Sequence, residues 1–174
     1  KKIIILGSTG SIGKSTLKII KANNKNFSIE LLSTNKNINK IFNQAIEFKV
    51  KNIIVSDYTK YLEAKKKFKN KNIKIYNNFD GIDKILKFRK VYYSMIAISG
   101  LEGLKPVLKL TRYSKNLAIV NKESLICGWS LIKKSLRKYK TNFIPIDSEH
   151  FSIFSLLNEK NSHLVDKVYI TASG

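Results

Sequence analysis

Short apolar runs and longer amphipathic stretches alternate along most of the chain. The apolar runs are rich in isoleucine, leucine and valine, as expected of parallel strands that helices cover on both faces. This alternation predicts an α/β protein built on a doubly wound, mostly parallel sheet of the Rossmann type. The predicted strands occupy residues 3–6, 27–32, 52–56, 73–76, 91–98, 117–120 and 143–146.

The stretches between these runs carry apolar residues at the i, i+3, i+4 spacing of amphipathic helices. Ile38, Ile41 and Ala45 show this spacing after the second run. A further helix is expected from Leu101, with Pro106 in its first turns, where proline is best tolerated. A long helix is expected before the last strand. The residues assigned to its single apolar face are Leu125, Ile126, Trp129, Ile132 and Leu136.

A glycine-rich turn joins the first predicted strand to the first helix. Gly7, Gly10 and Gly13 stand three residues apart, so backbone can approach a ligand closely and the helix can pack against the strand. The first helical amides lack intrahelical acceptors and can bind a phosphate or pyrophosphate. A Walker A loop requires glycine where Ser8 stands, and a strict G-x-G-x-x-G motif requires glycine at Thr9. The turn is therefore a variant of the dinucleotide motif, and a turn that serves only packing is the alternative.

Polar and charged residues recur directly after the predicted strands. Ligands of doubly wound sheets bind outside the carboxyl ends of the strands, so these positions should line a site. They are residues 7–12, 33–37, 99–100, 121–123 and 147–150.

The residues after the second strand bear on the choice of cofactor. An NAD enzyme usually carries an acidic residue there, which binds the ribose 2′-hydroxyl. This chain has Thr34, Asn35, Lys36 and Asn37 instead. Because Lys36 can pair with a 2′-phosphate that a carboxylate would repel, the sequence favours NADP over NAD. With 33 basic residues in the chain, an ordinary surface lysine at this position is the alternative.

The sequence Asp147-Ser148-Glu149 follows the last predicted strand. Two carboxylates at i and i+2 offer the hard oxygen ligands that Mg²⁺ or Mn²⁺ prefers, and Ser148 between them can contact a substrate. The alternative is a helix N-cap followed by an acidic first-turn residue that favours the helix dipole. His150 is interpreted as a structural neighbour of this cluster and not as a metal ligand.

The formal net charge of +21 attracts polyanions at low salt. Only Arg89, Arg112 and Arg137 are arginines, and the lysines are spread over every predicted helix and loop, as on a solvated surface. We therefore expect no specific nucleic-acid partner. Cys127 is the only cysteine, which excludes an intrachain disulfide, and no apolar run approaches the about 20 residues that cross a bilayer. We expect no membrane partner and a cytoplasmic location, or a plastid-type organelle if the source is eukaryotic.

Four motifs occur together: GSTGSIG at residues 7–13, NKES at 121–124, IPIDSEH at 144–150 and TASG at 171–174. In this order and at these separations they resemble the 1-deoxy-D-xylulose 5-phosphate reductoisomerase family of the non-mevalonate isoprenoid pathway. The resemblance implies an oxidoreductase that uses NADPH and Mg²⁺ or Mn²⁺. Its reaction would be the isomerisation and reduction of 1-deoxy-D-xylulose 5-phosphate to 2-C-methyl-D-erythritol 4-phosphate. The alternatives are the NADP-binding domain of another reductase and a basic nucleic-acid-binding module.

The resemblance also implies roles for individual residues. The implied cofactor-binding residues are Thr9, Gly10, Ser11, Ile12, Asn35, Lys36, Asn37, Asn121 and Glu123. The implied substrate-binding residues are Lys122, Ser148, Glu149 and Ser173, and the implied metal ligands are Asp147 and Glu149. Lys122 and Glu149 are the implied catalytic residues. The family usually has glycine where Asn35 stands, so the chain departs from its pattern at the 2′-phosphate loop.

The family is longer than these 174 residues. The resemblance therefore implies an N-terminal portion, in which residues 1–147 form the NADPH-binding domain and residues 148–174 begin a truncated catalytic domain. The family's lid, third metal carboxylate and C-terminal domain have no counterpart in this sequence. We expect the fragment alone to be inactive and the complete enzyme to be a homodimer that acts on a small phosphorylated sugar.

Overall fold

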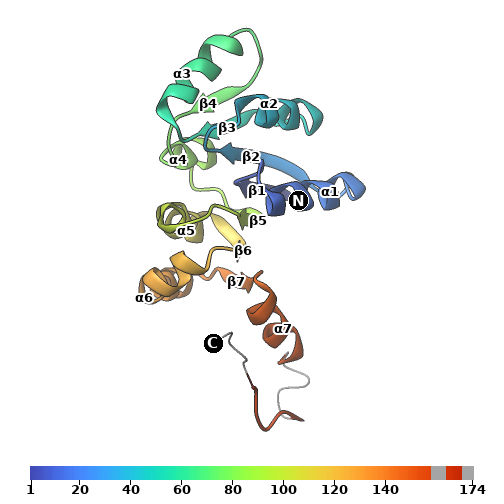
Figure 1. Ribbon diagram of the computed structural model, residues 1–174, viewed down its shortest axis with the longest axis vertical. Helices are drawn as coiled ribbons and strands as arrows, with labels where there is room; N and C mark the ends of the chain where they lie inside the picture. Colours follow the sequence, from blue (N-terminus) through green and yellow to red (C-terminus); the bar gives the residue numbers. More distant parts are fainter. Residues whose placement is uncertain (158–163, 170–174) are drawn as a thin grey trace.

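Seven parallel strands form one sheet in the order β4-β3-β2-β1-β5-β6-β7 (Figure 1). The structure is a computed structural model, which describes residues 1–157 and 164–169. The strands are β1 (Lys2–Leu6), β2 (Ser28–Thr34), β3 (Asn52–Val55), β4 (Lys74–Tyr76), β5 (Val91–Ile96), β6 (Ser114–Ile119) and β7 (Asn142–Pro145). The predicted doubly wound Rossmann-type fold is confirmed, and every pairing among the described strands is parallel.

Helices alternate with the strands and cover both faces of the sheet. They are α1 (Ser11–Ala22), α2 (Ile38–Glu47), α3 (Tyr58–Lys67), α4 (Gly81–Leu86), a 3₁₀ turn η1 (Leu101–Gly103), α5 (Leu104–Tyr113), α6 (Lys122–Tyr139) and α7 (Ser148–Leu156). None of the helices in the described parts of the chain combines the length and the apolar character needed to cross a membrane.

The sheet grows from β1 in two directions, toward β4 on one side and toward β7 on the other. Because crossovers between parallel strands are right-handed, this reversal places the two sets of helices on opposite faces. α1 and α2 lie on one face, and α4, α5 and α6 lie on the other (Figure 1). The alternation along β1 serves both faces, since Ile3 and Ile5 pack with α1 and α2 while Ile4 and Leu6 pack with α4, α5 and α6.

The helical periodicity read from the sequence matches the buried positions of α2, and the proline expected in the first turns of a helix also lies where it was predicted. Ile38, Ile41 and Ala45 of α2 are all buried, as their spacing predicts. Pro106 lies in the first turn of α5, where its missing amide hydrogen removes no intrahelical bond.

Two expectations about local structure need correction. β6 begins at Ser114, earlier than residue 117, because the Ser114 hydroxyl is buried and donates to Ser94 Oγ at 2.7 Å, so a polar residue starts this strand. On α6, Ile132 and Leu136 are buried but Ile126 is 80% exposed. The single apolar face predicted for this helix is therefore wrong at Ile126, which lies about 100° around the helix from Leu125.

Candidate functional site

A groove crosses the carboxyl edge of the sheet between β1 and β5, where the strand order reverses. Two hollows of about 290 Å³ each meet there, and both are lined by Gly10, Ala97, Ile98 and Ser99. One hollow extends to the end of β2, and the other extends to the start of α6. In doubly wound sheets this crevice is the place where ligands bind.

The glycine turn forms the middle of the groove and leaves no room for side chains. Gly7 has φ of +78°, and a Cβ atom there would lie 2.2 Å from the Ala97 carbonyl oxygen. A Cβ atom at Gly13 would lie 2.4 Å from the Gly7 carbonyl oxygen. The turn thus holds the start of α1 directly against the ends of β1 and β5. Because the N-cap of α1 is Gly10, no side chain caps the first amides of the helix, which are free to meet an anion.

Buried hydrogen bonds fix this turn to β2 and α2. The Gly7 amide donates to Ser33 Oγ, and the Ser8 amide donates to the Ser33 carbonyl, both at 2.9 Å. Ser8 Oγ donates to Gln44 Oε1 at 2.8 Å, and Gln44 Nε2 donates to the Ser8 carbonyl at 3.0 Å. The turn is therefore held in one conformation by satisfied buried polar groups. Sequence reasoning missed this network, for which the one available signal is a glutamine among the apolar positions of α2.

A second set of contacts joins the turn to the end of β2. Thr9 Oγ1 and Thr34 Oγ1 share a hydrogen bond of 2.8 Å, and Thr34 Oγ1 also accepts from the Asn37 amide at 3.3 Å. Asn37 in turn caps α2, because its Oδ1 accepts from the Lys40 amide at 3.2 Å. The structure thus brings the predicted residues Thr9 and Asn37 to one end of the groove.

Asn35 and Lys36 turn toward the end of β3. Asn35 Nδ2 donates to Ser56 Oγ at 3.0 Å, and Lys36 Nζ lies 3.9 Å from Asp57 Oδ2. The pKa of Asp57 is held below its ordinary value, chiefly by the hydrogen bond from Thr59 and then by the amide of the α3 first turn, with a smaller attraction from Lys36. The sequence after β2 contains no carboxylate, but the neighbouring strand places an ionised one beside Lys36. This neighbour could not be seen from the residues that follow β2.

Asn121 is the N-cap of α6 and links this helix to the loop after β5, at the other end of the groove. Its Nδ2 donates to the carbonyls of Ile98, at 2.7 Å, and of Gly100, while its Oδ1 accepts from the Ser124 amide at 2.9 Å. The side chain is 5% exposed. Because its donors and acceptor are engaged inside the protein, Asn121 can act on a ligand by fixing the loop after β5 and through its backbone.

Lys122 and Glu123 begin α6 and line the same hollow as Ser11 and Ile12 of α1. Lys122 also borders a second, apolar hollow of about 590 Å³, to which α6, β7 and α7 contribute Trp129 and other residues. Lys122 therefore stands between the polar groove and an apolar surface. The predicted cofactor and substrate positions at the start of α6 are thus brought beside those of α1.

Asp147 is the N-cap of α7, as the alternative interpretation of this cluster supposed. Its Oδ1 accepts from the His150 amide at 2.8 Å, and the His150 ring nitrogen Nδ1 lies 2.7 Å from Oδ1 and 2.6 Å from Oδ2. The Asp147 side chain is 7% exposed. A helix cap and a metal ligand are compatible uses of one carboxylate, but a cation at Asp147 would have to displace the His150 ring.

The other residues expected at the metal and substrate end are only partly described. Ser148 and Glu149 lie in the first turn of α7, and Ser173 lies outside the described residues. No group of three His, Cys, Asp or Glu side chains suited to a metal ion occurs in the described parts of the chain. Asp147 supplies the right donor chemistry for Mg²⁺ or Mn²⁺, but it is one ligand out of the six or so that such ions take.

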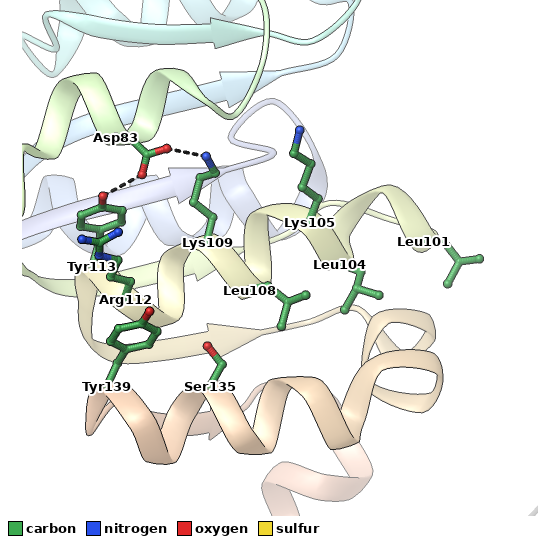
Figure 2. A pocket seen from close by; sticks show the side chains of 10 residues that line it. All are labelled: Asp83, Leu101, Leu104, Lys105, Leu108, Lys109, Arg112, Tyr113, Ser135 and Tyr139. Carbon is green, nitrogen blue, oxygen red and sulfur yellow. Dashed lines mark hydrogen bonds and ion pairs between the residues drawn. The ribbon is translucent and has the colours of Figure 1, made fainter.

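A wider hollow of about 740 Å³ runs along the outer side of α5 and touches α4 and α6 (Figure 2). Within it, Lys109 and the Tyr113 hydroxyl both bind Asp83 (Figure 2). Residues that directly follow the central strands do not line it. Although this hollow is larger than the groove, we do not take it as the functional site, because ligands of doubly wound sheets bind at the carboxyl ends of the strands.

The doubly wound sheet, with its glycine turn in a groove at the switch point, places the chain in the class of Rossmann-type α/β proteins. Comparison with known families narrows the class. The family model described as 1-deoxy-D-xylulose 5-phosphate reductoisomerase matches residues 3–128, and the model described as its C-terminal domain matches residues 143–174. The chain belongs to the 1-deoxy-D-xylulose 5-phosphate reductoisomerase family, which confirms the resemblance read from its motifs.

Curated relatives support this assignment over the whole chain. A 1-deoxy-D-xylulose 5-phosphate reductoisomerase of Pelagibacter ubique is 57% identical over 100% of this chain and 45% of its own length. The enzyme of the same name from Thermotoga maritima is 36% identical over 100% of this chain and 43% of its own length. The chain thus spans less than half the length of these relatives.

Solved structures of the family share the fold. The 1-deoxy-D-xylulose 5-phosphate reductoisomerase from Zymomonas mobilis in complex with NADPH superposes with a TM-score of 0.84 at 29% identity, covering 94% of this chain and 43% of that one. A DOX-P reductoisomerase in complex with NADPH, fosmidomycin and magnesium gives a TM-score of 0.84 at 31% identity, covering 92% of this chain and 40% of the other.

Proposed function

We propose that this chain is the N-terminal, NADPH-binding part of an enzyme that converts 1-deoxy-D-xylulose 5-phosphate to 2-C-methyl-D-erythritol 4-phosphate. The observation that carries the proposal is the preformed groove at the β1–β5 switch point in a chain of this family. Relatives solved with NADPH and magnesium support the choice of cofactors. The enzyme would require Mg²⁺ or Mn²⁺, and it would be a reductoisomerase whose fragment of 174 residues is inactive alone.

The residues of the groove fit a dinucleotide. The uncapped start of α1 offers amides to the pyrophosphate, and the close packing at Gly7 and Gly13 leaves the space for it. Lys36 offers a positive charge at the end of β2, where the 2′-phosphate of NADPH would lie. We assign cofactor contacts to Thr9, Gly10, Ser11, Ile12, Asn35, Lys36, Asn37, Asn121 and Glu123.

The substrate would lie at the other end of the groove, beside the starts of α6 and α7. When bound, NADPH supplies hydride and the divalent cation supplies Lewis acidity. We assign the cation to Asp147 and Glu149, and substrate contacts to Lys122, Ser148, Glu149 and Ser173. Lys122 would hold the substrate and stabilise negative charge that develops on its oxygen. Lys122 and Glu149 are therefore the proposed catalytic residues.

The domain boundary follows from this division. Residues 1–147 would form the NADPH-binding domain, and residues 148–174 would begin the catalytic domain. We propose further that the complete enzyme is a homodimer and that it works in the cytoplasm.

Turnover by a protein of full family length that carries this sequence tests the proposal. We expect NADPH oxidation that requires both 1-deoxy-D-xylulose 5-phosphate and Mg²⁺ or Mn²⁺, with the branched polyol phosphate as product, identified by mass spectrometry. NADPH oxidation without the sugar phosphate, or with no metal requirement, would show that the enzyme is a different reductase.

A further inference from the structure

The hollow along α5, about 740 Å³ in volume, has two chemically different ends. Arg112 and Tyr139 lie at one end, and Leu101 lies at the other (Figure 2). The side chains of Leu104 and Leu108 line the stretch between them (Figure 2). Arg112 follows Leu101 by 11 residues, which is roughly 17 Å of helix. The hollow is therefore a trough about three helical turns long, charged at one end and apolar at the other.

One carboxylate, that of Asp83, also lines the trough, but its charge is already matched inside the protein. Lys109 and the Tyr113 hydroxyl both donate to it, the hydroxyl at 2.7 Å. Lys109 also lies 2.8 Å from Asp80 Oδ1, and Lys105 lies 3.6 Å from the same oxygen. These two carboxylates and two ammonium groups balance one another, so the cluster gives the trough no excess of negative charge.

The Arg112 guanidinium has no carboxylate partner of this kind. In the described parts of the chain it forms no ion pair. It packs instead over two aromatic rings, 5.1 Å from the ring centroid of Phe88 and 5.4 Å from that of Tyr113. Phe88 is 80% exposed and has φ of +71°, so a strained residue holds an apolar ring beside this charge at the surface. A cation in the last turn of a helix also favours the helix dipole, so the charge of Arg112 would not indicate a ligand without the trough beside it.

Two further cations lie at the same end, close to Tyr139. The Lys138 ammonium lies 5.4 Å from the Tyr139 ring centroid, and the Lys90 ammonium donates to the Tyr139 carbonyl. No hydrogen bond joins the Tyr139 hydroxyl to another residue that the structure describes. A guanidinium and a phenolic hydroxyl both donate to carboxylate oxygens. This end of the trough is thus suited to an anionic group.

We propose that the trough binds an anionic amphiphile of the fatty-acid type, whose carboxylate lies between Arg112 and the Tyr139 hydroxyl. Its alkyl chain runs along Leu108 and Leu104 toward Leu101. Hollows of about 300 to 1,000 Å³ that combine apolar walls with a few polar groups are typical of small-molecule sites. A second copy of the chain is a poor occupant, because two molecules of formal charge +21 repel each other. The inference does not depend on the proposed function, since the trough shares no lining residue with the groove.

Two fatty acids that differ only in chain length separate the contributions of head group and tail. Calorimetric titration of the 174-residue chain would use hexanoate and dodecanoate, the latter below the concentration at which it forms micelles. Arg112→Gln removes the charge at the head-group end, and Leu101→Ser removes the apolar side chain at the far end. The matched controls are Arg137→Gln, at an exposed site of α6 outside the trough, and Ile126→Ser, in the apolar hollow of α6 and α7. Melting temperatures of all five proteins verify that each is folded.

We expect dodecanoate to bind at one site, at least about tenfold more tightly than hexanoate, because each buried CH₂ group adds affinity. Arg112→Gln should weaken the binding of both fatty acids about tenfold, since charge-assisted bonds between arginine and a carboxylate are strong. Leu101→Ser should weaken dodecanoate at least about threefold and leave hexanoate unchanged, because the shorter chain does not reach Leu101. Both control variants should stay within about twofold of the unchanged chain.

Failure of dodecanoate to bind, or equal affinities for the two fatty acids, would overturn the proposal, because the trough would then hold no alkyl chain. Equal losses in Arg112→Gln and Arg137→Gln would also overturn it, because general surface charge would explain the binding. If Ile126→Ser weakened the binding of dodecanoate and Leu101→Ser did not, the fatty acid would lie in the apolar hollow of α6 and α7, and the trough along α5 would not be its site.

Discussion

The β1–β2 end of the groove and the junction of β7 with α7 differ in how far their side chains are already arranged for a ligand. At the β1–β2 end, the glycine turn is locked by Ser8, Ser33 and Gln44, and Thr9 and Asn37 both bond to Thr34. Outside the residues that line the groove, at the junction of β7 and α7, Asp147 is engaged by His150 and serves as a helix cap. The bonds of the glycine turn hold the first end in one conformation, whereas the side chains that the structure describes at the second supply one carboxylate of suitable chemistry, that of Asp147.

This difference has an energetic meaning. A nucleotide that enters the β1–β2 end orders few side chains, so little of its binding free energy is lost to conformational entropy. A cation at Asp147 must first break the contacts with His150, and it gains few protein ligands in return. Nucleotide binding should therefore need only the groove described above, while metal binding should need ligands beyond those that the described side chains supply.

The largest expected effect is the loss of the preformed turn. Gly13→Ala places a Cβ atom 2.4 Å from the Gly7 carbonyl oxygen and 2.5 Å from Ser8 Cα, and backbone atoms cannot yield cheaply. We expect the free energy of unfolding to fall by about 3 kcal/mol, together with nucleotide affinity, as urea unfolding and titration would measure. Gly10→Ala is the control for stability, since Gly10 has φ of −75° and its added methyl would lie 3.4 Å from the Gly7 carbonyl oxygen, an ordinary contact. It should cost about 1 kcal/mol or less, because alanine is a poorer helix N-cap than glycine; equal losses would show that close packing at Gly13 is unimportant.

Glu149→Gln tests the opposite end. In an enzyme of full family length we expect kcat to fall about a hundredfold at saturating NADPH, because polarisation by the metal matters most in the transition state. Steady-state kinetics with nucleotide, metal and substrate varied separately would measure it, and Glu63→Gln on the remote helix α3 is the control. If Glu149→Gln changed nucleotide affinity alone, the substrate could not lie beside α7.

A smaller effect is expected for Lys36→Ala at the cofactor end. Exposed ion pairs contribute at most about 1 kcal/mol, so the apparent KM for NADPH should rise by up to about fivefold. kcat should stay unchanged, because a contact far from the nicotinamide binds ground state and transition state alike. A fall in kcat at saturating NADPH would show that Lys36 does not bind the ground state and the transition state equally.

The smallest effect concerns the hollow along α5, which lies away from both ends of the groove. The pKa of Asp80 is lowered mainly by the hydrogen bond that it accepts from Lys109. Burial raises the pKa of Asp83, but the hydrogen bonds from Lys109 and Tyr113 outweigh burial and lower it. Groups with a depressed folded pKa stabilise the fold above the ordinary value of 3.8, and this stability is lost as the pH falls through the folded values. Lys109→Gln should therefore lower the free energy of unfolding by less than about 1 kcal/mol near neutral pH, and the variant and the unchanged chain should become equally stable in acid. Urea unfolding across pH 2 to 7 would measure this difference, which would stay constant with pH if these ion pairs contribute nothing.

The parts of the site that the sequence could predict are those whose signals are local. The glycine spacing identified the turn, and the apolar runs placed the strands whose ends form the groove. Contacts between elements left no such signal: Asp57 reaches Lys36 from the neighbouring strand, and Gln44 reaches Ser8 from α2. Ile126 was misplaced because hydrophobicity alone cannot tell a buried face from an exposed apolar surface.

Separate titrations of the 174-residue chain with NADPH, NADH and Mn²⁺ test most directly whether the nucleotide end is built independently of the metal end. In metal-free buffer we expect NADPH to bind at least about tenfold more tightly than NADH, a difference of about 1.4 kcal/mol. Mn²⁺ alone should bind only weakly, since most of its ligands would be water. Tight binding of Mn²⁺ to the chain, or binding of NADPH that appears only after Mn²⁺ is added, would contradict the independence of the two ends.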